Sequence, residues 1–243
     1  MTDPRQELVQ RLFRRTGATY DFIVKVGTFG CDPVWKKKIL ARVPSDSRRV
    51  LDLACGTGIV TLAMARRLPQ GHVIGVDITE EYLDIAREKA EREKVTNVEF
   101  VHRRAEAVFF DEPFDCITAS YLPKYADLKT LAQNMKRLLK ENGVLVMHDF
   151  TYPSNPIVQA LWEFYFKLLQ TVGSRMYPNW RTIFYELPDV VRNTTWLPDL
   201  IASLKQSGFT QITVERLIVG SAAIVTARNV RSTDRGPGES RRN

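Results

Sequence analysis

The sequence is poor in cysteine and has no long apolar run. Its 243 residues include three cysteines, Cys31, Cys55 and Cys116, whose irregular spacings fit neither a disulfide framework nor a zinc site. We therefore expect no metal site and a reducing, cytoplasmic compartment. No apolar stretch reaches the roughly 18 residues that cross a bilayer. The N-terminal MTDPRQELVQRLFRR also lacks the apolar core that a secretion signal carries.

Acidic residues are outnumbered. The chain has 35 Lys and Arg against 28 Asp and Glu, which gives a formal charge of +7. Part of this excess lies in RNVRSTDRGPGESRRN at the C-terminus, where no apolar residue follows Val230. We interpret residues 229–243 as a disordered basic tail and residues 1–228 as a single domain. We expect no nucleic-acid partner, and a non-catalytic nucleotide- or RNA-binding module is the alternative from another functional class.

Strands and helices alternate along the first 150 residues. The predicted strands are 48–53, 72–77, 97–102, 114–120 and 144–150, and the predicted helices are 58–68, 80–93 and 128–140. Asn142-Gly143 is typical of a helix stop, so we expect it to close the last of these helices. The alternation predicts βαβ units and a parallel sheet, whose ligands bind at the carboxyl ends of the strands.

The pattern changes after residue 150. Residues 155–172 predict a helix that is apolar nearly all round, with a polar stripe of Gln159, Glu163 and Lys167. Two interpretations stay open: a buried core helix, or a lid over a lipophilic substrate. A Pro- and aromatic-rich connector follows through Leu197. We expect a helical insertion in the domain at about residues 152–197. The chain then predicts a helix at 198–207 and two antiparallel edge strands at 209–217 and 220–228.

The first glycine turn lacks one glycine of a dinucleotide site. Asp52 ends a strand, and Gly56 and Gly58 follow, but Thr61 holds the position of the third glycine. A carboxylate here repels a diphosphate and favours a ligand with ammonium and sulfonium charges. S-adenosylmethionine carries those charges and no phosphate, so we expect it as the cofactor. Asp77 ends the second strand, where we expect it to accept hydrogen bonds from the ribose hydroxyls.

Several motifs resemble those of known enzymes. DLACGTG, GVDITEEYL and LLKENGVLVM resemble the motifs of class I SAM-dependent methyltransferases. YDFIVKVGTFGCDPVWKK and FDCITAS resemble, more narrowly, segments of the ubiquinone/menaquinone biosynthesis C-methyltransferase family. The resemblance covers roughly residues 13–228. It implies a Rossmann-like α/β fold with a seven-stranded, mostly parallel sheet, an antiparallel C-terminal hairpin and a helical substrate lid.

The resemblance also implies the cofactor-binding residues, which are Asp52, Gly56, Thr57, Gly58, Asp77, Ile78, Arg104, Ala105 and Ser120. The chain departs from the family at two places. Arg104 stands where the family commonly has Asp or Asn, so we expect the backbone near Ala105 to contact the adenine. Lys124 and Tyr125 stand where the family has Arg-Asn. Lysine for arginine is not conservative where a planar bidentate donor is needed, so whether Lys124 takes the role of that arginine stays open.

The implied activity is C-methylation of a prenylated quinol ring of the demethylmenaquinol or ubiquinol type. The alternative is methylation of another small aromatic or lipid-like acceptor at C, O or N. Carbon methylation needs an electron-rich ring carbon, which deprotonation of the ring hydroxyl supplies. The candidate catalytic residues are Tyr20, Tyr121, Lys124 and His148, although a lone histidine beside a strand is more often structural.

The expected partners follow from a lipophilic substrate. Burying an isoprenoid tail requires apolar walls, which the aromatic insertion offers. Basic side chains in the N-terminal helix attract anionic lipid weakly, so we expect peripheral contact with a membrane. A homodimer is a further expectation.

Overall fold

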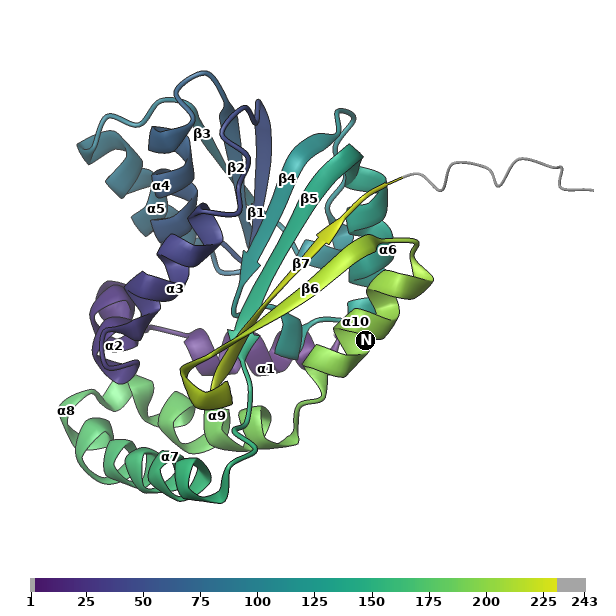
Figure 1. Cartoon of the computed structure of the whole chain (residues 1–243). Helices are drawn as coiled ribbons and strands as arrows, with labels where there is room; N and C mark the ends of the chain where they lie inside the picture. Colours follow the sequence, from purple (N-terminus) through teal and green to yellow (C-terminus); the bar gives the residue numbers. More distant parts are fainter. Residues whose placement is uncertain (1–2, 231–243) are drawn as a thin grey trace, which may run out of the picture.

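The computed structural model describes residues 3–230, and within them one seven-stranded sheet runs in the order β3-β2-β1-β4-β5-β7-β6 (Figure 1). The strands are β1 (Arg49–Leu53), β2 (His72–Asp77), β3 (Val98–His102), β4 (Phe114–Ser120), β5 (Leu139–Phe150), β6 (Thr210–Leu217) and β7 (Ala222–Arg228). β1 to β5 are parallel, and β7 lies antiparallel between β5 and β6. The predicted sheet is confirmed, except that β7 is not an edge strand.

Both faces of the sheet are buried, because successive side chains of a strand point to opposite faces. Leu51 and Leu53 of β1 join the cluster under α6 (Leu128–Leu138) and α10 (Trp196–Gln206). Val50, just before Leu51, joins the opposite cluster under α3 (Cys31–Leu40) and α4 (Ile59–Arg67). α5 (Glu80–Arg92) packs beside β2 and β3. The sheet is therefore a rigid platform whose strand ends hold the site.

The N-terminal segment lies across the carboxyl ends of the strands (Figure 1). Its elements are α1 (Pro4–Phe13), η1 (Gly17–Thr19) and α2 (Tyr20–Gly27), with short turns η2 (Ala105–Ala107) and η3 (Pro123–Tyr125) facing them from the sheet. A third apolar cluster joins Leu12 of α1 and Ile23 of α2 to Tyr125 of η3. The N-terminal helices are thus held against the edge where a ligand is expected.

The helical insertion covers the same edge from below in Figure 1. It consists of α7 (Pro156–Leu168), the π-helical η4 (Leu169–Gly173), α8 (Ser174–Met176), η5 (Pro178–Trp180) and α9 (Arg181–Asn193). The stretch described as a Pro- and aromatic-rich connector through Leu197 is therefore largely helical. α9 buries Ile183, Phe184 and Val191 on one face although Pro188 lies inside it. Burial of that face offsets the roughly 3 kcal/mol that an internal proline costs.

Two expectations about helices are also corrected. α6 ends at Leu138, and Asn142-Gly143 lies within β5, where the pairing with β4 shifts between Phe114 and Cys116. Asn142 takes a positive φ of 62° in this irregularity, so it shapes a bulge and closes no helix. α7 contains no buried residue, so the core interpretation of this helix fails. None of the described helices is long and apolar enough to cross a bilayer.

The C-terminal boundary also differs from the expectation. Asn229 was assigned to the disordered tail, but its side chain is buried and its Nδ2 donates to the Leu139 carbonyl at 2.7 Å. Its backbone N–H donates to the Gly143 carbonyl at 3.0 Å. The fold therefore includes Asn229, and residues 231–243 of the predicted tail lie outside the described residues.

Candidate cofactor and acceptor site

The glycine turn after β1 brings bare backbone to the edge of the sheet. Gly56 and Gly58 have φ values of 55° and 78°, a region that side chains disfavour. A Cβ on Gly58 would lie 2.9 Å from the Cβ of Ala86 in α5, so no side chain fits there. A Cβ on Gly56 would meet only Tyr82, at 3.9 Å. The turn therefore packs tightly against α5 at Gly58 and stays open at Gly56.

Asp77 at the end of β2 is tied to this turn. Its Oδ2 accepts the Gly56 N–H at 2.8 Å, and its Oδ1 accepts the Thr79 N–H at 2.8 Å. Burial raises the pKa of Asp77, and these backbone donors oppose the rise. Each carboxylate oxygen keeps a further lone pair, which suits it to accept from two neighbouring hydroxyls of a ligand.

A cleft lies between this turn and the N-terminal helices. Six of the expected cofactor-binding residues line it, namely Gly56, Asp77, Ile78, Arg104, Ala105 and Ser120. Its lining also includes two of the four catalytic candidates, Tyr20 and Tyr121. The structure therefore brings the ends of β2 and β4 and the loop after β3 to one site, as expected of parallel strands that meet at their carboxyl ends.

Aromatic rings narrow the cleft. Phe13, Tyr20, Tyr82 and Tyr125 line it and form one cluster, with the Tyr20 and Tyr82 ring centroids 5.0 Å apart. The cavity measures about 100 Å³, below the roughly 300–1,000 Å³ of small-molecule pockets. The polar groups thus suit a nucleoside, but a ligand of that size requires the rings to move outward.

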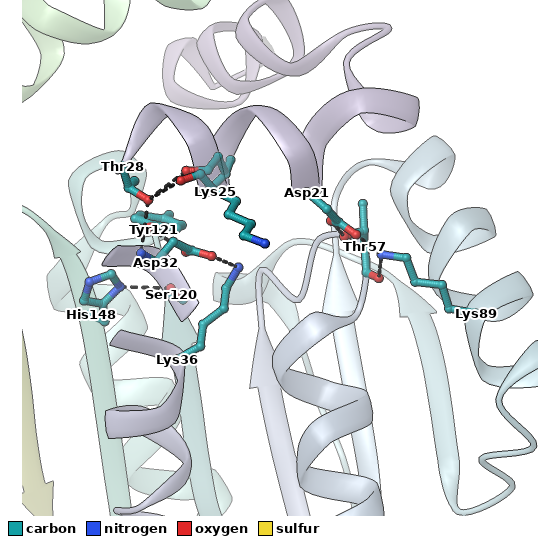
Figure 2. A network of polar contacts seen from close by, with 11 residues as sticks. Asp21, Lys25, Thr28, Asp32, Lys36, Thr57, Lys89, Ser120, Tyr121 and His148 are labelled. Carbon is teal, nitrogen blue, oxygen red and sulfur yellow. Dashed lines mark hydrogen bonds and ion pairs between the residues drawn. The ribbon is translucent and has the colours of Figure 1, made fainter. Parts of the chain in front are cut away.

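Polar contacts fasten the N-terminal segment over the cleft. Thr16 and Tyr82 share a hydroxyl–hydroxyl bond of 2.5 Å. Asp21 of α2 accepts from the Thr57 hydroxyl at 2.5 Å and pairs with Lys89 of α5 (Figure 2). Thr57, expected to bind the cofactor, is therefore not part of the cleft lining in this conformation; it joins α2 to the glycine turn.

Asp52 lies away from the cleft, contrary to the expectation. Its carboxylate accepts from the Thr61 hydroxyl at 2.6 Å and from the Thr118 hydroxyl at 2.7 Å. Burial raises its pKa to about 6, although the two hydroxyls oppose the shift. The contacts join β1 to α4 and β4, so Asp52 acts here as a structural bridge. Thr61, at the third glycine position, is its partner.

Lys124 and Asp149 form a buried ion pair. The Lys124 Nζ lies 2.6 Å from the Asp149 Oδ1, with side chains 2% and 0% exposed. The same Nζ donates to the Tyr121 carbonyl at 3.2 Å and lies 4.3 Å from the Tyr125 ring centroid. Neither Lys124 nor Asp149 lines the cleft. The pair holds the loop after β4 against β5, which leaves Lys124 no direct access to an acceptor.

His148 is also behind the cleft wall. Its Nδ1 is 3.0 Å from the Ser120 hydroxyl, while its buried Nε2 has no hydrogen-bond partner within residues 3–230 (Figure 2). Burial, with smaller contributions from Lys124 and Lys36, lowers the pKa of His148 to about 3. The ring is therefore neutral near pH 7 and contacts the cleft lining through Ser120 and through the Tyr121 ring, whose centroid lies 5.0 Å away.

Tyr121 and Asp32 form the acid–base pair nearest the cleft. The Tyr121 hydroxyl donates to the Asp32 Oδ1 at 2.8 Å, and the Asp32 Oδ2 pairs with the Lys36 Nζ at 2.6 Å (Figure 2). Tyr121 has a positive φ of 64°, which is strained for a tyrosine. Burial and the Asp32 charge raise its pKa well above the ordinary value. Such a tyrosine stays protonated near pH 7.

Sequence reasoning missed Asp32, although a signal was present. Asp32, Trp35 and Ile39 are spaced to share one face of α3, and all three are buried. A carboxylate on a buried helix face needs a partner, and Lys36 one turn later supplies it. The other partner, Tyr121 just after β4, is 89 residues away and leaves no such signal in the sequence.

Comparisons with known proteins agree with this geometry. The model of the ubiE/COQ5 methyltransferase family matches residues 1–229. A demethylmenaquinone methyltransferase of Listeria monocytogenes is 29% identical over 217 residues, which cover 87% of this chain and 91% of the relative. One from Staphylococcus aureus is 27% identical over 223 residues, covering 90% and 92%.

Solved structures show the same fold at low sequence identity. The N-methyltransferase NodS from Bradyrhizobium japonicum, bound to S-adenosyl-L-homocysteine, has a TM-score of 0.62 at 14% identity and covers 93% of this chain and 99% of its own. The phosphoethanolamine N-methyltransferase 2 of Haemonchus contortus has a TM-score of 0.67 at 16% identity, covering 95% of this chain and 61% of its own.

Proposed function

Because this chain belongs to the ubiE/COQ5 methyltransferase family, and so uses S-adenosylmethionine, we propose that it methylates a ring carbon of a prenylated quinol of the demethylmenaquinol type. The observation that carries the choice of acceptor is the Tyr121–Asp32 pair, since methylation at carbon needs the ring hydroxyl deprotonated. The names of the Listeria and Staphylococcus relatives support the same acceptor.

The proposed cofactor site uses backbone and one carboxylate. S-adenosylmethionine, when bound, supplies a methyl group activated by a sulfonium. Asp77 accepts the ribose hydroxyls, and Gly56 lets the backbone approach the ligand closely. The backbone at Ala105 faces the adenine, because the Arg104 guanidinium is engaged by Asp3 at 2.6 Å. These residues orient the methyl donor and do not take part in proton transfer.

The proposed proton path runs from the cleft into the protein. The acceptor's ring hydroxyl gives its proton to the Tyr121 hydroxyl oxygen, and Tyr121 passes its own proton to Asp32. The ring becomes an enolate with a nucleophilic carbon, Asp32 becomes neutral, and the total charge is unchanged. After methylation the ring carbon releases a proton to water, which restores aromaticity, and Asp32 returns its proton through Tyr121 to the ring oxygen. Lys36 holds Asp32 in place for this relay.

The other candidate residues take supporting roles. Tyr20 lines the cleft, but among the described residues its hydroxyl donates to no carboxylate as that of Tyr121 does, so it serves as a hydrogen-bond donor or a wall of the acceptor pocket. His148 orients Ser120, and Lys124 holds the loop that carries Tyr121. We therefore assign proton removal to Tyr121 with Asp32.

The test is a reconstitution that compares a prenylated acceptor, demethylmenaquinol, with quinols that lack a prenyl chain. Purified protein, labelled S-adenosylmethionine and demethylmenaquinol should yield a product heavier by one methyl, with the label on a ring carbon. A label on oxygen, or transfer only to acceptors without a prenyl chain, would contradict the proposal. In that case the alternative, another small aromatic or lipid-like acceptor, would replace it.

A further inference from the structure

α7 presents an unusually apolar face to solvent. Six side chains from α7 to α8 are between 47% and 72% exposed, namely Ile157, Leu161, Phe164, Leu168, Val172 and Met176. They recur every three or four residues, so they lie along one side of the helix. A surface helix of a globular protein normally turns such a face to the core. We call these six side chains the α7 stripe.

α2 extends this surface toward the cleft. Its Phe22, Val26 and the following Phe29 are 54%, 55% and 75% exposed. The Phe29 ring lies 4.6 Å from that of Tyr165, whose hydroxyl donates to the Gly27 carbonyl at 2.8 Å. α2 begins at Tyr20, which lines the cleft. The contacts of Tyr165 with Phe29 and Gly27 therefore join α7 to the end of α2, and the start of α2 reaches the cleft through Tyr20.

The charges on this surface have one sign. The exposed charged residues among 156–176 are Lys167 and Arg175, and α2 adds the exposed Lys25. The only acid among residues 156–176, Glu163, lies in the same polar stripe as Lys167, and its charge is paired with Arg192 of α9 at 2.8 Å. An apolar stripe bordered by cations matches a helix that lies in the interface of an anionic bilayer.

We propose that the α7 stripe and the exposed side of α2 dock on the surface of an anionic lipid bilayer. A second copy of the chain fits this surface less well, because a symmetric contact brings the same cations face to face. The proposal deepens the proposed function, since a prenylated acceptor dissolves in the bilayer and the docked cleft receives it there. It also requires anionic lipid headgroups, whereas the proposed function does not depend on the charge of the lipid.

The first test measures partition onto vesicles without cofactor or acceptor. We expect wild-type protein to sediment with vesicles of phosphatidylcholine and phosphatidylglycerol, and about tenfold less with phosphatidylcholine alone, because each cation near the surface contributes to binding. Leu161→Glu with Phe164→Glu should lower partition on anionic vesicles at least about tenfold. Phe109→Glu is the matched control, since Phe109 is 73% exposed in the loop before β4, outside the stripe.

A second pair of variants separates charge from apolar contact. Lys167→Glu with Arg175→Glu should lower binding to anionic vesicles and abolish the preference over neutral ones, whereas the exposed Lys129→Glu in α6 should change neither. Thermal melts should be unchanged, because every substituted side chain is exposed. Absence of wild-type binding to anionic vesicles, or equal binding by the α7 variants, overturns the proposal.

Light scattering tests the competing occupant. If the wild type is a dimer that Leu161→Glu with Phe164→Glu dissociates, and vesicles do not bind, then a second copy covers the stripe and the proposal is overturned. The assay also separates this proposal from the proposed function. Vesicle binding without methylation of demethylmenaquinol contradicts only the function, and methylation of a short-chain quinol without vesicle binding contradicts only the docking surface.

Discussion

The cofactor half and the acceptor half of the site share one edge of the sheet but are built differently. On the cofactor side, Asp77 is 7% exposed and its carboxylate accepts two backbone N–H groups from fixed turns. On the proposed acceptor side, α7 has no buried residue, and its Phe164, which does not line the cleft, is 66% exposed. The first half is held by hydrogen bonds within the sheet platform, whereas α7 is joined to α2 and α9 by the contacts of Tyr165 with Phe29 and Gly27 and by the Glu163–Arg192 ion pair.

This difference shows how one fold combines precision with adaptability. A group that must be aligned for an in-line displacement needs fixed partners, which buried strand ends provide. An acceptor with a long apolar chain needs an apolar surface that fits chains of different lengths and lets the acceptor pass to and from the lipid. Segments with few buried apolar contacts also open most readily. The comparison therefore predicts that substitutions in the polar half lower cofactor affinity strongly, and that substitutions in the exposed half change the stability of the fold little.

The largest effect should come from Asp77→Ala. Removing the carboxylate leaves the ribose hydroxyls without their acceptor and the Gly56 N–H without its partner. We expect affinity for S-adenosyl-L-homocysteine, measured by calorimetry, to fall at least about 100-fold, the loss of two strong hydrogen bonds. Far-UV circular dichroism should be unchanged.

Asp111→Ala is the control for this change, because Asp111 is exposed and does not line the cleft. It should bind the ligand as the wild type does. Unchanged affinity in Asp77→Ala would contradict the ribose assignment, and with it the view that the polar half defines the cofactor.

The next effect should come from Asp32→Asn, which removes the final proton acceptor of the relay. We expect kcat to fall about 100-fold or more, in the range that general base catalysis contributes. Cofactor affinity should stay within about twofold, because Asp32 does not line the cleft. In the variant, the rate should rise with pH as the free quinol ionises in solution, so the pH profile separates lost proton transfer from lost structure.

Tyr121→Phe serves as the second variant, since it keeps the ring and its stacking on Phe150 while removing the hydroxyl. It should show a similar loss of kcat and a similar pH profile, and the double variant should be no worse than either single one. Additive losses would show that Asp32 and Tyr121 act separately and would remove the relay.

A smaller effect concerns stability. The pKa of Asp52 is raised to about 6 in the folded protein from its ordinary 3.8. A raised carboxyl pKa gives a stability contribution that is present below about pH 4 and is lost as pH rises through the folded value. Relative to Asp52→Asn, the wild type should lose about 3 kcal/mol of unfolding free energy between pH 4 and pH 7. Urea titrations at several pH values measure the difference, and a pH-independent difference would contradict it.

The parts that sequence predicts well are those fixed by local pattern. The bounds of β2 and β4, and the place of Asp77 beside the glycine turn, follow from a run of apolar residues and the turn after it. Residues at the carboxyl ends of neighbouring parallel strands lie close together because these ends meet at one edge of the sheet. The fold class and the cofactor side were therefore accessible without coordinates.

The parts that sequence misses depend on partners far along the chain. The sequence around the glycine turn does not reveal that Asp52 accepts a hydrogen bond from Thr118, 66 residues away, so Asp52 was expected to contact the ligand. The stretch that forms α9 was described only as a Pro- and aromatic-rich connector, whereas tertiary burial stabilises a helix there in spite of Pro188. α7 was open to two interpretations because an all-round apolar pattern does not say whether protein or lipid covers it.

The smallest effect should follow from deleting residues 231–243, which lie outside the described residues. Removal lowers the formal charge from +7 by two units, because the segment holds four arginines, one aspartate and one glutamate. Both halves of the site lie within residues 3–230, so turnover and cofactor affinity should stay within about twofold. The deletion also isolates the RNA-binding alternative, since binding through a basic segment collapses as salt rises. If RNA retention on filters survives both the deletion and about 0.2 M salt, the remaining surface binds nucleic acid and the expectation of no such partner fails.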